Sequence, residues 1–279
     1  MKSLEGIKIV SLCINLPGPV AAHLLQELGA QITKVEPPGG DPLFHVLPEF
    51  YHYLNQNQEI IVLNLKESSD RASLDVLLSE ADLLLTSSRS EALDRLGLDS
   101  KSLQKKFPRL CHVAIVGELS QGHPGHDLTY QAEAGLILPP SMPLTCIADM
   151  VGAKSAVSMS LSLILLRERK NLVTNATVAL TDAARYCALP LQFGLTGNGK
   201  ILGGANAAYN LYQTKNGWIA LAALEPHFEE KLKSGLGIDL INYETLKKLF
   251  MNKTSSEWKK WAETNDIPLA EVRSMMHGT

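Results

Sequence analysis

A doubly wound α/β fold, with a mostly parallel, Rossmann-like sheet and a second, smaller α+β domain, is the architecture that this sequence predicts. Short β-rich apolar runs alternate with stretches of helical periodicity along the larger, N-terminal part of the 279 residues. After a glycine-rich connection, the pattern changes to a hairpin followed by amphipathic helices. We therefore expect a large domain over residues 1–195 and a small domain over residues 196–279.

The N-terminal segment predicts a βαβ unit, the building block of a parallel sheet. Residues 7–12 form a β-rich apolar run, residues 15–20 break it with two prolines and a glycine, and residues 21–30 resume with helical spacing. Gly29 is expected to end this helix, because glycine takes the left-handed conformation of a helix end without steric cost. Residues 31–36 then form the second predicted strand.

The alternation of strand and helix continues along the large domain. Further strands are predicted at residues 59–65, 82–88 and 109–117, and a strand followed by a helix at residues 175–189. Ser68 or Ser69 is expected to cap one helix, and Asp99 or Ser100 another, since short polar side chains accept hydrogen bonds from free N–H groups at helix starts. A long, mostly buried helix is expected from Asp149 onwards.

The small domain is expected to begin with a hairpin over residues 209–224. Its predicted turn is Lys215-Asn216-Gly217, because an Asn-Gly pair supplies the positive φ angles of a tight hairpin turn. Amphipathic helices follow at residues 225–237 and 255–266, the second of them capped by Ser255 or Ser256.

Composition bounds the function classes. The formal charge is −3 and no dense Lys/Arg cluster occurs, so we expect no nucleic-acid partner. Apolar runs such as residues 158–166 are shorter than the roughly 20 residues of a membrane span, so we expect no membrane association. The N-terminus lacks the features of a signal peptide, which predicts a cytoplasmic location. The four cysteines stand singly, without metal-ligand spacing, so we expect no metal site.

Several segments, in order, resemble CoA-transferase family III (CaiB/BaiF) and its α-methylacyl-CoA racemase branch. The opening of the resemblance is residues 4–42, which match the family's first strand, Gly-Pro loop and second strand. Residues 81–99 are similar to its loop arginine and RLGL-type helix, and residues 265–272 to a late segment that leads the chain back from the small domain. The match spans nearly the whole chain.

Three motifs carry the catalytic part of the resemblance. The motif PGHDLTYQAEAG places His126 on the racemase histidine, and CIADMVGA places Asp149 on the family's catalytic aspartate. The Glu-Pro-x-Phe motif places Glu225 where a carboxylate would orient His126. Taken without the resemblance, His126 reads as a turn or surface residue, Asp149 as a helix cap and Glu225 as a first-turn carboxylate.

The resemblance implies an enzyme that acts on acyl-CoA thioesters. A thioester acidifies the neighbouring α-carbon, so two bases on opposite faces can epimerise a 2-methylacyl-CoA. Histidine titrates near neutrality and a carboxylate is tuned upward by burial, which suits His126 and Asp149 to these roles. The alternatives are a CoA-transferase in which Asp149 attacks the thioester as a nucleophile, and a non-catalytic relative with a binding or scaffold role.

The resemblance also implies residues that bind CoA. Arg89 matches the loop arginine, Lys34 lies beside the turn after the second strand, and Tyr130 is expected to pack against or orient the ligand. The chain departs from the family where a basic stretch is replaced by Gln58 and Glu59, which weakens the predicted phosphate site. Relatives form interlocked dimers, and we expect a homodimer here.

Overall fold

The computed structural model describes residues 2–119 and 124–273. The chain divides into two compact units, Met1–Ala188 and Leu189–Thr279, each with a hydrophobic core of its own. This division falls close to the predicted boundary after residue 195.

The first unit is built on a six-stranded sheet in which all neighbouring strands are parallel. The strand order is β3-β2-β1-β4-β5-β6. The strands are β1 Lys8–Leu12, β2 Gln31–Glu36, β3 Glu59–Val62, β4 Leu83–Thr86, β5 Cys111–Val116 and β6 Asn175–Ala179. The predicted fold class is confirmed, and β1 lies between β2 on one side and β4 on the other. The strand order therefore reverses between β1 and β4.

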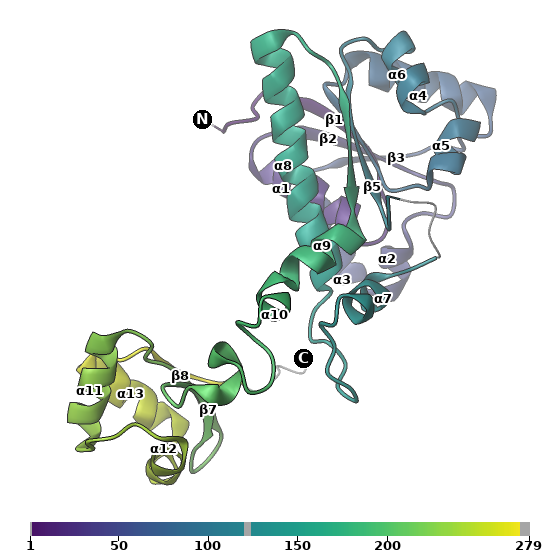
Figure 1. Cartoon of the computed structure of the whole chain (residues 1–279). Coiled ribbons are helices and arrows are strands. Elements are labelled where there is room, and N and C mark those ends of the chain that lie inside the picture. Colours follow the sequence, from purple (N-terminus) through teal and green to yellow (C-terminus); the bar gives the residue numbers. More distant parts are fainter. Residues whose placement is uncertain (1, 120–123, 274–279) are drawn as a thin grey trace. The chain divides into compact units, whose positions relative to one another are not determined.

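Helices cover both faces of this sheet (Figure 1). One face packs against α1 (Pro17–Glu27), α8 (Ile147–Lys170) and α9 (Leu180–Cys187). The opposite face packs against α4 (Ser68–Glu80), α5 (Ser90–Arg95) and α6 (Ser100–Lys106). The short helices α2 (Pro42–Val46), α3 (Pro48–Asn55) and α7 (Asp127–Glu133) follow β2 and β5 in the chain.

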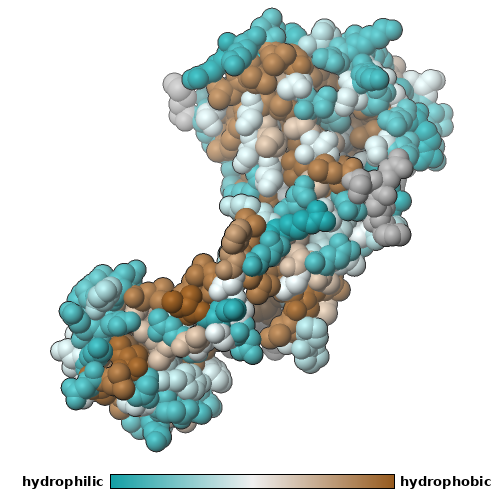
Figure 2. All heavy atoms as spheres, in the orientation of Figure 1, coloured by the Kyte–Doolittle hydropathy of each residue, from teal (hydrophilic) through white to brown (hydrophobic). Residues whose placement is uncertain are grey.

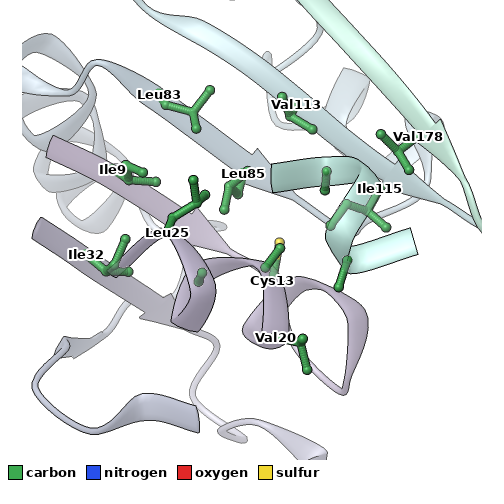
Figure 3. Close-up of a cluster of buried hydrophobic side chains, with 14 of the residues drawn as sticks. Ile9, Cys13, Val20, Leu25, Ile32, Leu83, Leu85, Val113, Ile115 and Val178 are labelled. Carbon is green, nitrogen blue, oxygen red and sulfur yellow. The ribbon is translucent and has the colours of Figure 1, made fainter. Parts of the chain in front are cut away.

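The strands alternate their side chains between the two faces. Ile9 of β1 points into the core beneath α1, whereas Val10 joins the core beneath α4. Figure 3 shows side chains of the strands, among them Ile32 and Val113, together with Leu25 of α1 in the first of these cores. Each such fully buried aliphatic side chain contributes about 1.5–3 kcal/mol to folding.

The ends of the helices differ in places from the prediction. Helix α1 begins at Pro17 rather than beyond the prolines, because proline fits the first helical turn, where its missing N–H has no partner to lose. Gly29 follows the helix with φ +109°, as predicted. Asp99 caps α6 as predicted, but α4 is preceded by Glu67, and the Ser68 or Ser69 cap is wrong.

Helix α8 is the long helix that the sequence predicts. By length and composition alone it could cross a membrane, since small residues extend its apolar character beyond the run at residues 158–166. Core helices share these two properties. One face of α8 packs against β5, α1 and α9, whereas Met150, Met159 and Leu165 are exposed, so the helix is only partly buried.

Over its described residues, the second unit contains a three-stranded antiparallel sheet of order β7-β8-β9, four α-helices and a short π-helical turn at Ile201–Ala205. The elements are α10 Leu189–Gln192, β7 Tyr209–Gln213, β8 Trp218–Ala222, α11 Pro226–Leu236, α12 Tyr243–Phe250, α13 Ser255–Asn265 and β9 Leu269–Glu271. Residues from the sheet and from α11, α12 and α13 form its core, with Tyr212, Phe250 and Trp258 at the centre. The predicted small α+β unit is thus present.

Two local predictions in this unit are wrong. The hairpin forms, but Asn216 and Gly217 do not have positive φ, because the Asn216 side chain instead accepts a hydrogen bond from the N–H of Ser255 at 2.9 Å. Helix α13 is capped by Thr254 rather than by Ser255 or Ser256. Thr254 and Glu257 form a reciprocal capping box.

Candidate active site

The candidate site lies where β5 delivers the chain to α7 and where α8 begins. Helix α7 packs against α8, and the start of α7 meets the start of α8. The start of α7 follows β5 in the chain, so the site lies at the carboxyl ends of the parallel strands. This edge of the sheet is where α/β proteins bind their ligands. The predicted residues His126, Tyr130 and Asp149 all come from these two helices.

A buried carboxylate joins the two helices. Asp127 Oδ1 accepts a hydrogen bond from the backbone N–H of Asp149 at 3.1 Å. Its other oxygen accepts from the side-chain amide of Gln131 at 2.5 Å, and the same amide donates to the carbonyl of Thr145 at 2.9 Å. Asp127 is only 7% exposed, so it is held in place as a fixed negative charge at the start of α8.

The carboxyl group of Asp149 is a weaker acid than an ordinary aspartate. Burial, and secondly the charge of Asp127, raise its pKa from 3.8 to about 7. The side chain is partly buried in the first turn of α8. A carboxyl group that titrates near neutral pH exchanges a proton in either direction under physiological conditions, which is what acid–base catalysis requires.

His126 occupies the position just before α7, where its backbone is fixed and its imidazole is exposed. Its N–H donates to Thr129 Oγ at 3.1 Å, and its carbonyl accepts from the same hydroxyl at 2.8 Å. His126 precedes Asp127 in the chain, so the structure brings the backbones of His126 and Asp149 to adjoining helix starts. That their side chains face one carbon atom from opposite sides stays a prediction.

Tyr130 lies in a slot between two glycines. A Cβ atom on Gly117 would lie 2.3 Å from the Tyr130 hydroxyl, and one on Gly125 would lie 2.5 Å from the ring. Burial raises the pKa of Tyr130, and the nearby charge of Asp149 raises it further. The ring is therefore closely packed against the two glycines, and its predicted packing or orienting role at the ligand stays a prediction.

The two predicted cationic residues have different positions. Arg89 is exposed directly after β4, at the carboxyl edge of the sheet, and its charge lowers the pKa of Tyr130. Lys34 is 1% exposed, and its ammonium group pairs with Asp41 at 2.7 Å and Glu36 at 3.0 Å. The position of Lys34 does not support its predicted contact with a cofactor, because both carboxylates already occupy its donors in the interior.

Glu225 belongs to the second unit. It is exposed, it precedes α11, and its carbonyl accepts backbone hydrogen bonds from Phe228 and Glu229. This is the helix-start position that the sequence suggests for it. Its predicted partnership with His126 remains a prediction.

Two residues of the cluster were not assigned from the sequence. Asp127 stands in the GHDL motif and Cys146 three residues before Asp149, but neither spacing indicates that their side chains meet. The carboxylates of Asp127 and Asp149 and the Cys146 thiol lie within 4.8 Å of one another. Such spacing suits a cation as well as a shared proton, so the expected absence of a metal stays a prediction.

The doubly wound parallel sheet, together with a separate small antiparallel sheet, defines an α/β protein with a second, α+β unit. The sequence profile of CoA-transferase family III matches residues 4–277. The chain belongs to this family.

Its relatives include both activities weighed from the sequence. Human α-methylacyl-CoA racemase is 28% identical over 97% of this chain and 78% of its own length. The cinnamoyl-CoA:phenyllactate CoA-transferase of Clostridium sporogenes is 35% identical over 45% of this chain and 34% of its own length. These matches support an enzyme of CoA thioesters, and they leave isomerase and transferase chemistry both open.

Solved structures agree with the fold. A hypothetical protein from Mycobacterium tuberculosis has a TM-score of 0.86 at 24% identity and covers 99% of this chain and 85% of its own. A CaiB/BaiF family protein from Brucella suis has a TM-score of 0.82 at 22% identity, over 98% of this chain and 84% of its own. Both units therefore have counterparts in known structures of this fold.

Proposed function

We propose that the protein is an acyl-CoA racemase or epimerase that exchanges the α-proton of a 2-methylacyl-CoA thioester. The observation that carries this proposal is the Asp149 carboxyl, whose pKa of about 7 fits a group that must both take and return a proton. His126, one residue from the carboxylate that contacts Asp149, is the second acid–base group.

In the proposed reaction, one of the two groups removes the α-proton as its C–H bond breaks. The electron pair of that bond moves into the thioester, and an enolate forms. The other group, initially protonated, donates its proton to the opposite face of the same carbon. The product is the mirror-image centre, and the two catalytic groups end with their protonation states exchanged.

The enolate oxygen needs a stabilising environment. The start of α8 carries the positive end of the helix dipole, which favours negative charge that develops close to it. The N–H of Asp149 donates to Asp127, and the N–H of Met150 donates to the carbonyl of Cys146. The N–H groups of Ile147 and Ala148 are therefore the proposed donors to the oxyanion.

CoA-transferase chemistry is the second candidate, and relatives such as the acetyl-CoA:oxalate CoA-transferase of Acetobacter aceti favour it. In that reaction Asp149 would attack the thioester as a carboxylate. A pKa of about 7 leaves both the protonated and the ionised form of Asp149 populated at neutral pH, so it is compatible with either reaction. His126 in the GHDLTY motif favours proton exchange, because nucleophilic attack by Asp149 does not require a histidine.

The test is an incubation of the protein with a 2-methylacyl-CoA in deuterium oxide. We expect deuterium to enter the α-carbon, and His126→Ala and Asp149→Ala each to reduce the exchange at least about 100-fold, the usual contribution of a general acid or base. Asp182→Ala is the matched control, because Asp182 is also a first-turn aspartate, at the next helix along the sheet edge. It should exchange at the native rate.

Other outcomes separate the alternatives. Transfer of CoA to an added carboxylic acid, abolished by Asp149→Ala and little changed by His126→Ala, would replace the racemase proposal by the transferase. Calorimetry with acetyl-CoA and with free CoA tests the scaffold alternative. Absence of binding at millimolar ligand would favour a non-catalytic role.

Contacts to the CoA phosphates are part of the proposal. Arg89 is exposed at the carboxyl edge and is the predicted residue that remains available, since Lys34 is enclosed by carboxylates. Arg89→Met should weaken CoA binding in a salt-dependent manner, because the lost contact is a charge-assisted one.

A homodimer is the proposed assembly. Large apolar side chains are exposed in the segment 186–201, with Phe193 85% and Tyr186 69% exposed, and apolar patches reach the visible surface in Figure 2. Exposed apolar area of this kind is typical of protein interfaces. Light scattering should give twice the chain mass, and Phe193→Asp should shift it toward one chain.

A further inference from the structure

The loop that follows β1 occupies the point where the strand order of the sheet reverses. It comprises residues 13–16, and it lies at the carboxyl end of β1, between the loops that follow β2 and β4. In open α/β sheets the crevice at this reversal is the usual ligand site. None of the site residues named so far comes from this loop.

Both neighbouring loops hold the loop in place. The N–H of Asn15 donates to Asp41 Oδ1 at 2.9 Å, and Asp41 is itself paired with the buried ammonium of Lys34. On the other side, the N–H of Ile14 donates to the hydroxyl of Ser87, after β4, at 3.3 Å. The buried ion pair between Lys34 and Asp41 thus helps to fix the backbone of the loop after β1.

Asn15 is held in a left-handed conformation, with φ 68°. A residue other than glycine in this region carries a conformational cost, and such residues gather at ligand sites. Asn15 is exposed, and its carboxamide makes no hydrogen bond within residues 2–119 and 124–273. The fixed backbone therefore presents one amide group at the crevice.

The start of α1 offers little else to a ligand. Pro17 and Pro19 have no N–H, and the N–H of Val20 is bonded to the carbonyl of Leu16, which leaves the single N–H of Gly18 in the first turn. The start of α1, within the described residues, therefore does not offer several backbone N–H groups to a phosphate. The glycine-rich loops of many nucleotide-binding proteins do offer such a set of donors. The polar group that the loop contributes is the carboxamide of Asn15.

We propose that the Asn15 carboxamide is a specificity-determining contact for the CoA part of the substrate. It hydrogen-bonds a neutral group that both donates and accepts, such as an amide of the pantetheine arm or the edge of the adenine, because a carboxamide matches such a group with one donor and one acceptor. The end of β1 lies two strand spacings, about 10 Å, from the end of β5. A CoA thioester whose acyl carbon lies at Asp149 spans this separation. The inference rests on the proposed function.

Calorimetry with free CoA tests the inference, using Asn15→Gly. Glycine accepts the left-handed backbone and keeps the N–H bond to Asp41, so the variant removes only the carboxamide. We expect the Kd for CoA to rise about three- to tenfold, the effect of one neutral hydrogen bond. Titrations with pantetheine and with adenosine 3′,5′-bisphosphate identify which fragment loses affinity.

Asn171→Gly is the matched control, since Asn171 is also left-handed, with φ 51°, but ends α8 far from its catalytic start. It should bind CoA as the wild type does, and both variants should keep the native melting temperature. If Asn15→Gly binds CoA and both fragments with native affinity while the wild type also binds, the inference is wrong and the proposed function stands. If the wild type itself binds no CoA, the proposed function fails, and this inference with it.

Discussion

Asp127 accepts a hydrogen bond from the backbone N–H of Asp149, at 3.1 Å, and so fixes two carboxyl groups beside each other at the start of α8. The two carboxyl groups differ in their hydrogen bonding and in their pKa. Asp127 has its oxygens occupied by Asp149 and Gln131, whereas Asp149 has a pKa raised to about 7. Neighbouring carboxyls whose environments differ in this way are typical of acid–base sites.

Asp127→Asn should shift the pH dependence of α-proton exchange to lower pH. The asparagine oxygen still accepts from the Asp149 N–H, but the negative charge that helps to raise the pKa of Asp149 is removed. The ionised form of Asp149 then predominates at lower pH. In the profile of kcat/KM against pH, the rise on the acidic side should therefore move to lower pH by a measurable fraction of a pH unit or more. Glu133→Gln, which removes a charge from the same helix, is the control, and an equal shift in both variants would contradict the specific role of Asp127.

Asp149→Asn should stabilise the fold at alkaline pH while it removes activity. The folded-state pKa of about 7 lies above the ordinary value of 3.8, so the fold favours the protonated carboxyl. Its contribution is present below pH 4 and is lost as pH rises through 7. The free energy of unfolding of the variant should therefore exceed that of the wild type by on the order of 2 kcal/mol at pH 8, and should match it near pH 4. Urea unfolding at both pH values measures this, and an equal difference at both would show that the charge of Asp149 is not the cause.

The secondary structure and the motifs of the candidate site can be predicted from the sequence, whereas the contacts between distant side chains cannot. The strands, α8 and the motifs around His126 and Asp149 are local features with clear periodicity or spacing. The contact between Asp127 and Asp149 joins residues 22 apart across two helices, which no local pattern encodes. The same holds for Lys34, whose partner Asp41 lies beyond a turn and buries it.

The hairpin and the helix caps illustrate the same limit. Asn216 followed by Gly217 is a strong local signal for positive φ, but a hydrogen bond from Ser255, 39 residues away, fixes a different turn. Thr254 rather than Ser255 caps α13, because Ser255 is buried and bonded to Thr214 at 2.8 Å. Tertiary contacts thus decide between local options that the sequence leaves close in energy.

Lys34→Met should destabilise the first unit strongly and disturb the loop after β1. It leaves the buried carboxylates of Asp41 and Glu36 without their cation, which costs about 3–5 kcal/mol for a buried pair broken on one side. Urea unfolding measures the loss. Lys8→Met is the control, because the Lys8–Glu80 pair lies at the surface, with 52% and 64% of the side chains exposed, and its loss should leave stability nearly unchanged. Similar effects of the two substitutions would show that the buried network does not hold the fold.

His112 should make the protein acid-sensitive. It is 6% exposed on β5, its Nε2 lies 2.9 Å from the Thr86 hydroxyl, and burial lowers its pKa from 6.5 to about 4. The fold therefore favours the neutral imidazole, so its contribution to stability is present above pH 6.5 and is lost as pH falls through 4. The wild type should lose about 3 kcal/mol from this group across that range. His112→Gln keeps a hydrogen-bonding group beside Thr86 without a titrating ring, so its free energy of unfolding should fall less between pH 7 and pH 4. Thermal unfolding at closely spaced pH values measures both curves, and parallel curves would assign the acid sensitivity to other groups.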